Sequence, residues 1–239
     1  MELSKRVLEM QESPVRKLVP IATKVKKEGK KVFHLNIGQP DIETPKVFME
    51  AINHYDTKVI NYSFSQGEPI LIDSIRGFFA KDDILFDEDD ILITNGGSEA
   101  ITFCAIAVCD PGDDILVPEP FYTNYNGFTG EVNVNIIPIT TKASEGFHLP
   151  TKEEIVRLIT PKTKAILFSN PGNPTGTMLD RFAMGALIDA ASAQKASFIS
   201  DEIYHGIEYE AKAVTALELT DECYVINSFS KYFWYFFIM

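Results

Sequence analysis

The feature that most constrains the fold is the alternation of short apolar runs with helical segments along most of the chain. Runs such as AILF and VIN are almost continuously apolar, as in strands that helices cover on both faces. The segments between these runs carry apolar residues at a helical spacing. The alternation predicts an α/β fold, a three-layer α/β/α domain with a mainly parallel sheet.

The expected elements follow one another closely. Strands are expected at residues 31–38, 90–95, 113–120, 132–140, 164–170, 196–204 and 223–229. Helices are expected at residues 13–29, kinked at Pro20, at 44–55 with Thr44 as the cap, and at 67–82, 98–109, just after Tyr122, 151–159 and 180–194. Ligands bind beyond the carboxyl ends of the strands in such sheets, so the residues that follow each strand are the candidates for chemistry.

Composition narrows the functional classes. The 34 acidic residues exceed the 22 basic ones and give a net charge of −12, which argues against nucleic acid as the main partner. We expect a cytoplasmic protein, because the chain has neither a run of signal-peptide type nor one long enough for a membrane span. Three cysteines, Cys104, Cys109 and Cys223, lack the spacing of a metal site and are interpreted as reduced core residues.

Three of the expected turns carry candidate ligand-binding groups. After residues 90–95, the backbone N–H groups of Gly97 and Ser98 open a helix and suit a phosphate, although Gly-Gly is also common in a plain tight turn. After residues 113–120, Tyr122 suits stacking on a flat ligand or simple core packing. After residues 164–170, Asn173 lies in a loop stiffened by proline, either as an amide ligand or within a turn.

The last two strands end in charged residues. Asp201 is expected where one strand ends, with Tyr204 three residues later; a carboxylate there either caps or pairs at the surface or, if it lies in a cleft, holds a cationic ring nitrogen. Lys231 follows the final strand; it is either a solvated surface charge, as most lysines are, or a desolvated amine with a lowered pKa, the kind of nucleophile that forms Schiff bases. A phosphate cradle, a ring, an amide, a carboxylate and a reactive amine together match pyridoxal 5'-phosphate (PLP).

With these residues, the chain resembles the class I/II aminotransferases of the fold-type I PLP-dependent superfamily. The resemblance is carried, in the family's order, by NIGQPD (36–41), YSFSQG (62–67), NGGSEA (95–100), PEPFYTNY (118–125), NPGNPTG (170–176), DEIY (201–204) and SFSK (228–231). It implies a transfer of an amino group from an amino acid to a 2-oxo acid. It also implies an N-terminal arm with the start of a small domain at residues 1–45 and a PLP-binding large domain at residues 46–239.

The resemblance implies a role for each matching residue. Lys231 would hold the cofactor as an internal aldimine and shuttle a proton, and Asp201 would keep the ring nitrogen protonated. Asn173 and Tyr204 would hydrogen-bond the phenolic oxygen of the cofactor, and Tyr122 would stack on its ring. The remaining residues divide between the phosphate (Gly97, Ser98, Ser228 and, from a neighbouring subunit, Tyr62, which implies a homodimer) and the substrate (Gly38 at its carboxylate, with Asn173).

The sequence departs from the family after Phe233. The family continues through a glycine-rich stretch whose arginine binds the phosphate, and then through a C-terminal small domain whose arginine clamps the substrate carboxylate, whereas this chain reads WYFFIM and stops. We therefore expect a truncated or frameshifted product with impaired turnover. Two alternatives stay open, a PLP-dependent carbon–sulfur lyase of the same fold and an inactive cofactor-binding fragment.

Overall fold

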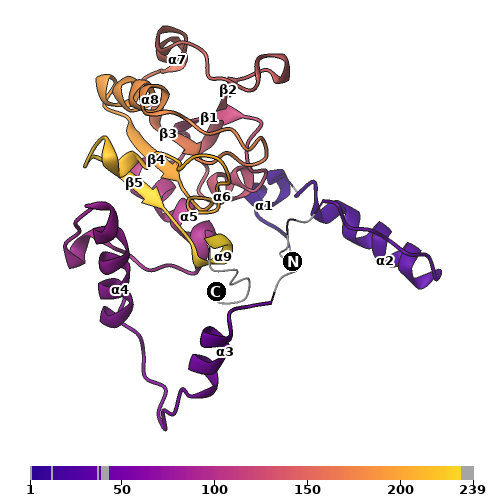
Figure 1. Cartoon of the computed structure of the whole chain (residues 1–239). Helices are drawn as coiled ribbons and strands as arrows, with labels where there is room; N and C mark the ends of the chain where they lie inside the picture. The colour runs from indigo at the N-terminus through magenta and orange to yellow at the C-terminus, as the bar shows by residue number, and fades with distance from the viewer. Residues whose placement is uncertain (1, 12, 37, 39–42, 233–239) are drawn as a thin grey trace.

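The centre of the molecule is a sheet of five parallel strands. The computed structural model describes residues 2–11, 13–36, 38 and 43–232. Within them the strand order is β2-β1-β3-β4-β5, and all neighbouring strands are parallel (Figure 1). The strands are β1 Asp114–Glu119, β2 Asn135–Thr140, β3 Thr163–Ser169, β4 Ser197–Asp201 and β5 Cys223–Ile226.

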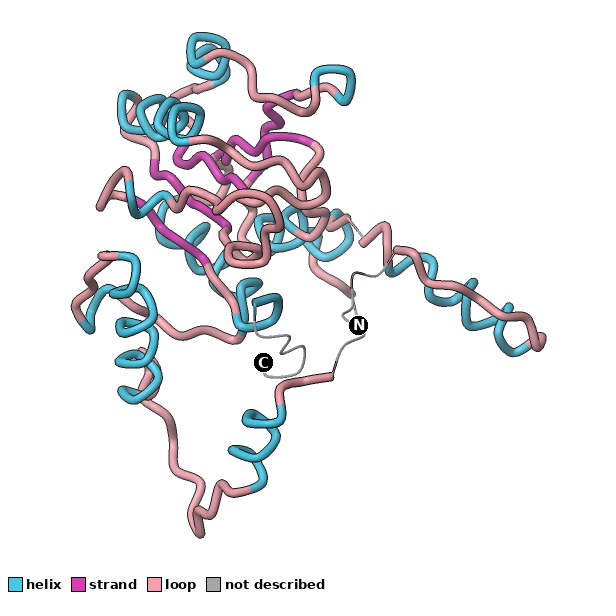
Figure 2. Tube along the Cα trace, in the orientation of Figure 1, coloured by secondary structure: helices cyan, strands magenta, loops and turns pink. Residues whose placement is uncertain are grey.

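Helices alternate with these strands over the second half of the chain, and Figure 2 shows the strands gathered between them. The described α-helices are α1 Lys5–Glu9, α2 Val19–Lys27, α3 Lys46–Asn53, α4 Pro69–Phe79, α5 Gly96–Val108, α6 Tyr125–Glu131, α7 Lys152–Leu158, α8 Arg181–Ala193 and α9 Phe229–Tyr232. The predicted α/β architecture with a parallel sheet is confirmed.

Two apolar cores lie on opposite faces of the sheet. Successive side chains of β1 divide between them, since Ile115 and Val117 pack with α5 and α6, whereas Leu116 packs with α7 and α8. The same alternation runs along β4, where Phe198 faces α8 and Ile199 faces α5. Strands buried on both faces explain the continuous apolar runs of the sequence.

The first ninety residues pack less closely. In Figure 1, α2, α3 and α4 lie outside the layers that enclose the sheet. Several large apolar side chains here are exposed, among them Leu35 at 97% and Ile60 at 89%. No helix among the described residues has the length and apolar character needed to cross a bilayer.

Two predicted strands are wrong. Neither residues 31–36 nor residues 91–94 join a strand ladder within the described chain. The Ile93 N–H instead donates to the Gln66 carbonyl at 2.8 Å, an isolated backbone bond. An apolar run favours an extended chain, but a strand also needs a partner beside it, which a local pattern cannot supply.

The other predicted elements are confirmed to within a few residues, with one correction at a helix start. Thr44 is not the cap of α3, because the helix begins at Lys46 with Pro45 at the cap position and no side-chain cap bond. The middle of the NIGQPD motif and the WYFFIM ending lie outside the described residues.

Candidate functional site

Asp201 is a deeply buried carboxylate at the carboxyl edge of the sheet. It ends β4, and its side chain is 3% exposed. One carboxylate oxygen accepts a hydrogen bond from the Tyr125 hydroxyl, and the other accepts from the Ile203 N–H at 3.3 Å. Burial raises the pKa of this carboxyl, while the Tyr125 and Ile203 hydrogen bonds and the charge of Lys231 oppose that rise.

Tyr204 and Asn173 meet beside this carboxylate. Tyr204 lies in the turn over residues 203–206, and Asn173 lies in the loop after β3. The Asn173 amide donates to the Tyr204 hydroxyl oxygen at 2.9 Å. The pKa of Tyr204 is raised, chiefly by burial and then by the charge of Asp201. The resemblance implied that these two residues act together, and the fold brings them into contact because β3 and β4 are neighbours.

Lys231 reaches the same place from β5. It lies half-buried in α9, with its Nζ 6.0 Å from the centre of the Tyr204 ring. Burial lowers the pKa of its amine, and the charge of Asp201 opposes that effect. Ser228, three residues earlier, donates from its hydroxyl to the Ser230 hydroxyl at 2.9 Å, and this contact helps to order the segment that carries the lysine.

Asp201, Tyr204, Asn173 and Lys231 form a cluster, and two tyrosines line its α6 side. Tyr122 is half-buried, and its ring meets that of Tyr125 edge to face with centroids 5.5 Å apart. The charge of Asp201 contributes to raising the pKa of both phenols, after burial. Sequence reasoning missed Tyr125, which is fully buried and bonded to Asp201. Its signal was a second aromatic residue three positions after Tyr122, where the turn that precedes α6, with the Tyr125 N–H donating to the Tyr122 carbonyl at 3.0 Å, brings the two rings together.

The start of α5 approaches the cluster closely. A methyl group added at Gly97 would lie 2.6 Å from Cδ1 of Ile203, the residue between Asp201 and Tyr204. Only glycine permits this approach with the present Ile203 rotamer. Ser98 is exposed in the first turn of the helix, where backbone N–H groups have no intrahelical acceptor. The predicted phosphate-binding residues are therefore next to the predicted ring-binding residues.

Two predicted residues are not brought into this cluster. Tyr62 is fully exposed on the segment that joins α3 to α4, and Gly38 is exposed with no atom within 4 Å of the position of a side-chain methyl. The described chain thus assembles Asp201, Tyr204, Asn173, Lys231 and Tyr122, and leaves these two apart.

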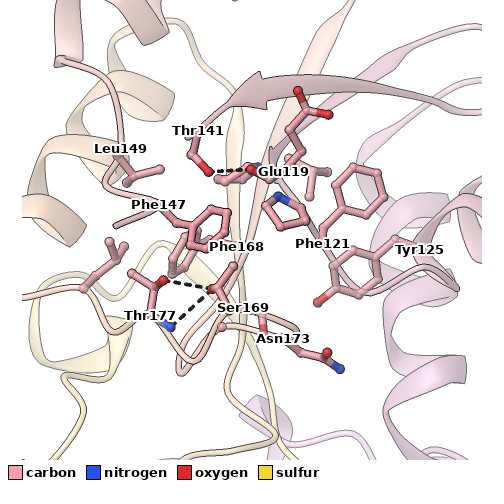
Figure 3. A pocket seen from close by; sticks show the side chains of 16 residues that line it. Glu119, Phe121, Tyr125, Thr141, Phe147, Leu149, Phe168, Ser169, Asn173 and Thr177 are labelled. Carbon is pink, nitrogen blue, oxygen red and sulfur yellow. Dashed lines mark hydrogen bonds between the residues drawn. The ribbon is translucent and has the colours of Figure 1, made fainter. Parts of the chain in front are cut away.

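A small cavity adjoins the cluster at the carboxyl ends of β1 and β3 (Figure 3). Its volume of about 30 Å³ has room for one or two water molecules. Phe121, Phe147 and Asn173 line it, and the Thr141 hydroxyl donates to the Glu119 carbonyl at 2.5 Å on its wall. A cofactor does not fit in this space, whose lining does not include Asp201.

The cysteines take no part in the cluster. Cys104, Cys109 and Cys223 are half-buried rather than fully buried, and desolvation raises the pKa of each thiol to about 11. Within the described residues, no group of three histidine, cysteine or acidic side chains is placed to hold a metal ion.

A family model connects this geometry to known proteins. The model for class I and II aminotransferases matches residues 30–234, which is most of the chain. The chain belongs to the class I and II aminotransferase family. Aminotransferases of this family are PLP enzymes.

Individual relatives agree with this assignment. The chain is 34% identical to the (5-formylfuran-3-yl)methyl phosphate transaminase of Methanocaldococcus jannaschii over 96% of its own length and 60% of the relative. The aspartate aminotransferase of Thermotoga maritima superposes with a TM-score of 0.89 at 29% identity, covering 96% of this chain and 62% of that one. The alanine aminotransferase of Pyrococcus furiosus superposes with a TM-score of 0.87 at 32% identity, covering 97% of this chain and 61% of that one.

The chain therefore spans about 60% of the length of the aminotransferases that it matches. These relatives are all transaminases by name, and nothing among them favours the carbon–sulfur lyase alternative. The residues of the cluster fit PLP chemically, because a buried carboxylate, an amide–phenol pair, a half-buried amine and aromatic rings are the groups that such a cofactor requires.

Proposed function

We propose that this chain carries the cofactor site of a PLP-dependent aminotransferase, which moves an amino group from an amino acid to a 2-oxo acid. The observation that carries the proposal is that the half-buried Lys231 amine lies 6.0 Å from the centre of the ring of Tyr204, which lies three residues after the buried Asp201 carboxylate and whose hydroxyl accepts from Asn173. When bound, PLP supplies a ring that withdraws electrons from the substrate α-carbon.

Lys231 serves as the nucleophile that holds the cofactor and as the base at the substrate α-carbon. Both roles need a neutral amine, and burial lowers the pKa of Lys231 in that direction. The opposing charge of Asp201 is the second influence on this pKa. A cationic ring that pairs with Asp201 would neutralise its charge, so that burial would become the main influence on the pKa of Lys231.

Asp201 orients and charges the ring nitrogen. A carboxylate that is 3% exposed is unstable without a cation, which explains the rise in its pKa. A protonated ring nitrogen provides that cation and would lower the pKa of Asp201 again. Asn173 and Tyr204 are proposed to hydrogen-bond an oxygen on the ring, and the 2.9 Å between their polar atoms supports this role.

The remaining residues are proposed to bind the cofactor phosphate and the substrate. Gly97 and Ser98 at the start of α5, with Ser228 after β5, are proposed to bind the phosphate. Gly38, together with Asn173, is proposed at the substrate carboxylate. A fully exposed Tyr62 suits a residue that reaches the phosphate of a second subunit, and we propose a homodimer on this basis.

Titration of the purified chain with PLP tests the proposal. We expect a visible absorbance band from covalently bound cofactor, with a borohydride-reduced adduct located at Lys231 by mass spectrometry. Lys231→Ala should abolish both signals, whereas Lys142→Ala, which changes a surface lysine paired with Glu145, should leave them unchanged. Without a band in the unaltered chain, or with the adduct on other lysines only, the site assignment fails and the inactive-fragment alternative is favoured.

Release of a 2-oxo acid from a supplied amino acid tests the reaction itself. A loaded chain that binds PLP at Lys231 but releases no 2-oxo acid from any of a panel of amino acids retains the site and lacks the transfer activity.

A further inference from the structure

Glu202 lies directly after Asp201 and points to the other side of the sheet. Its side chain is 1% exposed, although glutamate is rarely buried without partners. Side chains alternate along a strand, so Asp201 faces α6 and the ring site, whereas Ser200 and Glu202 face the layer of α8. Two adjacent buried carboxylates therefore belong to opposite faces of one strand end.

The side chain of Glu202 connects the strand to a distant segment. Its Oε1 accepts a hydrogen bond from the Ser200 hydroxyl at 2.8 Å and another from the Ala216 N–H at 2.9 Å. The Thr215 hydroxyl also favours the ionised carboxylate. One buried oxygen thus ties the end of β4 to residues 215–216, which precede β5.

The backbone of Glu202 completes this connection. Its N–H donates to the carbonyl of Ile226, the last residue of β5, at 2.8 Å, and its carbonyl accepts from the His205 N–H at 2.9 Å. The first bond fixes Glu202 beside the strand that leads to Lys231. The second closes the turn that carries Tyr204.

His205 faces the remaining oxygen of Glu202. Its Nδ1 lies 3.7 Å from Oε2, is buried, and has no hydrogen-bond partner within the described residues. Burial raises the pKa of Glu202, and the hydroxyl and amide donors and His205 oppose that rise. Asp82 and Lys212 form an ion pair 2.7 Å long. The pair lies within electrostatic reach of the His205 imidazole, which contributes to lowering the pKa of Asp82.

We infer that Glu202 is a positioning residue that holds Asp201 and Tyr204 in place from behind the sheet. The inference rests on the proposed function, because it gives Glu202 a purpose in the PLP site. It requires the Oε1 acceptor, which both Ser200 and Ala216 use. It also explains why a carboxylate is kept where an apolar residue of the same size would avoid the cost of burying a charge.

Three variants test the role of the acceptor. Glu202→Leu removes it, and Glu202→Gln keeps a carbonyl oxygen of the same reach. Ser200→Ala removes one donor without touching Glu202, and it decides the matter should the leucine variant not fold. Ile188→Val, in the same core but outside these contacts, serves as the control for a loss of general stability.

Two measurements are compared across the variants. The first is amide hydrogen exchange of residues 201–206 in the chain without cofactor, and the second is the Kd for PLP. Loss of one buried hydrogen bond is worth about 1.4 kcal/mol, a factor of about ten in an equilibrium constant. We expect about tenfold faster exchange and about tenfold weaker PLP binding in Ser200→Ala, which loses one such bond, larger changes in Glu202→Leu, which loses the acceptor of two, and near-normal values in Glu202→Gln and Ile188→Val.

The inference is overturned if Glu202→Leu and Ser200→Ala leave exchange of residues 201–206 and PLP affinity unchanged. It is also overturned if Glu202→Gln is as impaired as the leucine variant, or if Ile188→Val reproduces the local effect. A chain that binds no PLP refutes the proposed function instead, and the exchange of residues 201–206 still decides the role of Glu202.

Discussion

Replacing Tyr125 by phenylalanine would remove the hydroxyl that donates to Asp201 and almost nothing else. Tyr125 is fully buried, and its ring keeps its contacts with Phe121 and Tyr122 in the variant. The Asp201 carboxylate would retain the Ile203 N–H and the attraction of Lys231. The change therefore isolates one hydrogen bond at the centre of the candidate site.

The size of the effect follows from the charge and burial of the acceptor. A hydrogen bond to a charged group contributes about 1.5–3 kcal/mol. For a chain of this length each kcal/mol corresponds to about 2–4 °C in Tm, so Tyr125→Phe should lower Tm by roughly 3–12 °C near neutral pH.

The loss should depend on pH. Burial places the pKa of Asp201 above its ordinary value of 3.8, so the stability contributed by its protonated form is present below that value and is lost as the pH rises through the folded-state pKa. Without the Tyr125 donor, that pKa rises further and the ionised carboxylate becomes more costly. Tyr125 itself stays protonated throughout, because its pKa is well above 10.0.

Urea unfolding of the chain without cofactor, followed from about pH 4 to about pH 8, measures this difference. The free energy of unfolding of Tyr125→Phe should approach that of the unaltered chain at the acid end and fall below it as the pH rises. Tyr224→Phe, which alters a partly exposed tyrosine in β5, should match the unaltered chain at every pH. A loss that is the same at all pH values, or none at all, would refute the reasoning.

Two further outcomes are expected. Gly67→Ala should lower the free energy of unfolding in urea by about 1–3 kcal/mol, because the φ of +130° disfavours a side chain and the new methyl would lie 2.2 Å from Cγ1 of Ile93. An unchanged free energy would show that residues 64–67 do not hold the 91–94 segment. Alkylation of Cys104, Cys109 and Cys223 should accelerate about tenfold per pH unit from about pH 8 to about pH 10, since each thiol has a pKa of about 11, and a plateau below about pH 9 would contradict this burial.

The fold was largely predictable where strand and helix patterns are local. The runs that became β3 and β4 are apolar on both faces, and their burial between helices follows directly from that composition. At residues 31–36 and 91–94 a local apolar pattern was not enough to predict a strand. Both have strand-like composition, yet neither pairs in a ladder with any described part of the chain, because pairing depends on a neighbour that lies far away in the sequence.

The site could be predicted in its members but not in its contacts. Asp201 and Lys231 were identified because they follow expected strands, and the order of β4 and β5 in the sheet then places them together. Tyr125 escaped notice because its hydroxyl bonds to Asp201 across two elements, from α6 to the end of β4, and that contact exists only in the folded chain. Glu202 escaped for a similar reason, since its partners at Ser200 and Ala216 are evident only once the chain is folded.

The close contact of Gly97 with Ile203 bears on the ligand that the site accepts. Ile203 separates Asp201 from Tyr204, so the first turn of α5 rests on the same residue that spaces the carboxylate and the phenol. The distance from the helix start to Asp201 is therefore set by direct packing and not by a flexible loop. In the proposed PLP site, this fixed distance would select a ligand that carries an anionic group at one end and a ring nitrogen at the other by its length, before any of its individual hydrogen bonds are made.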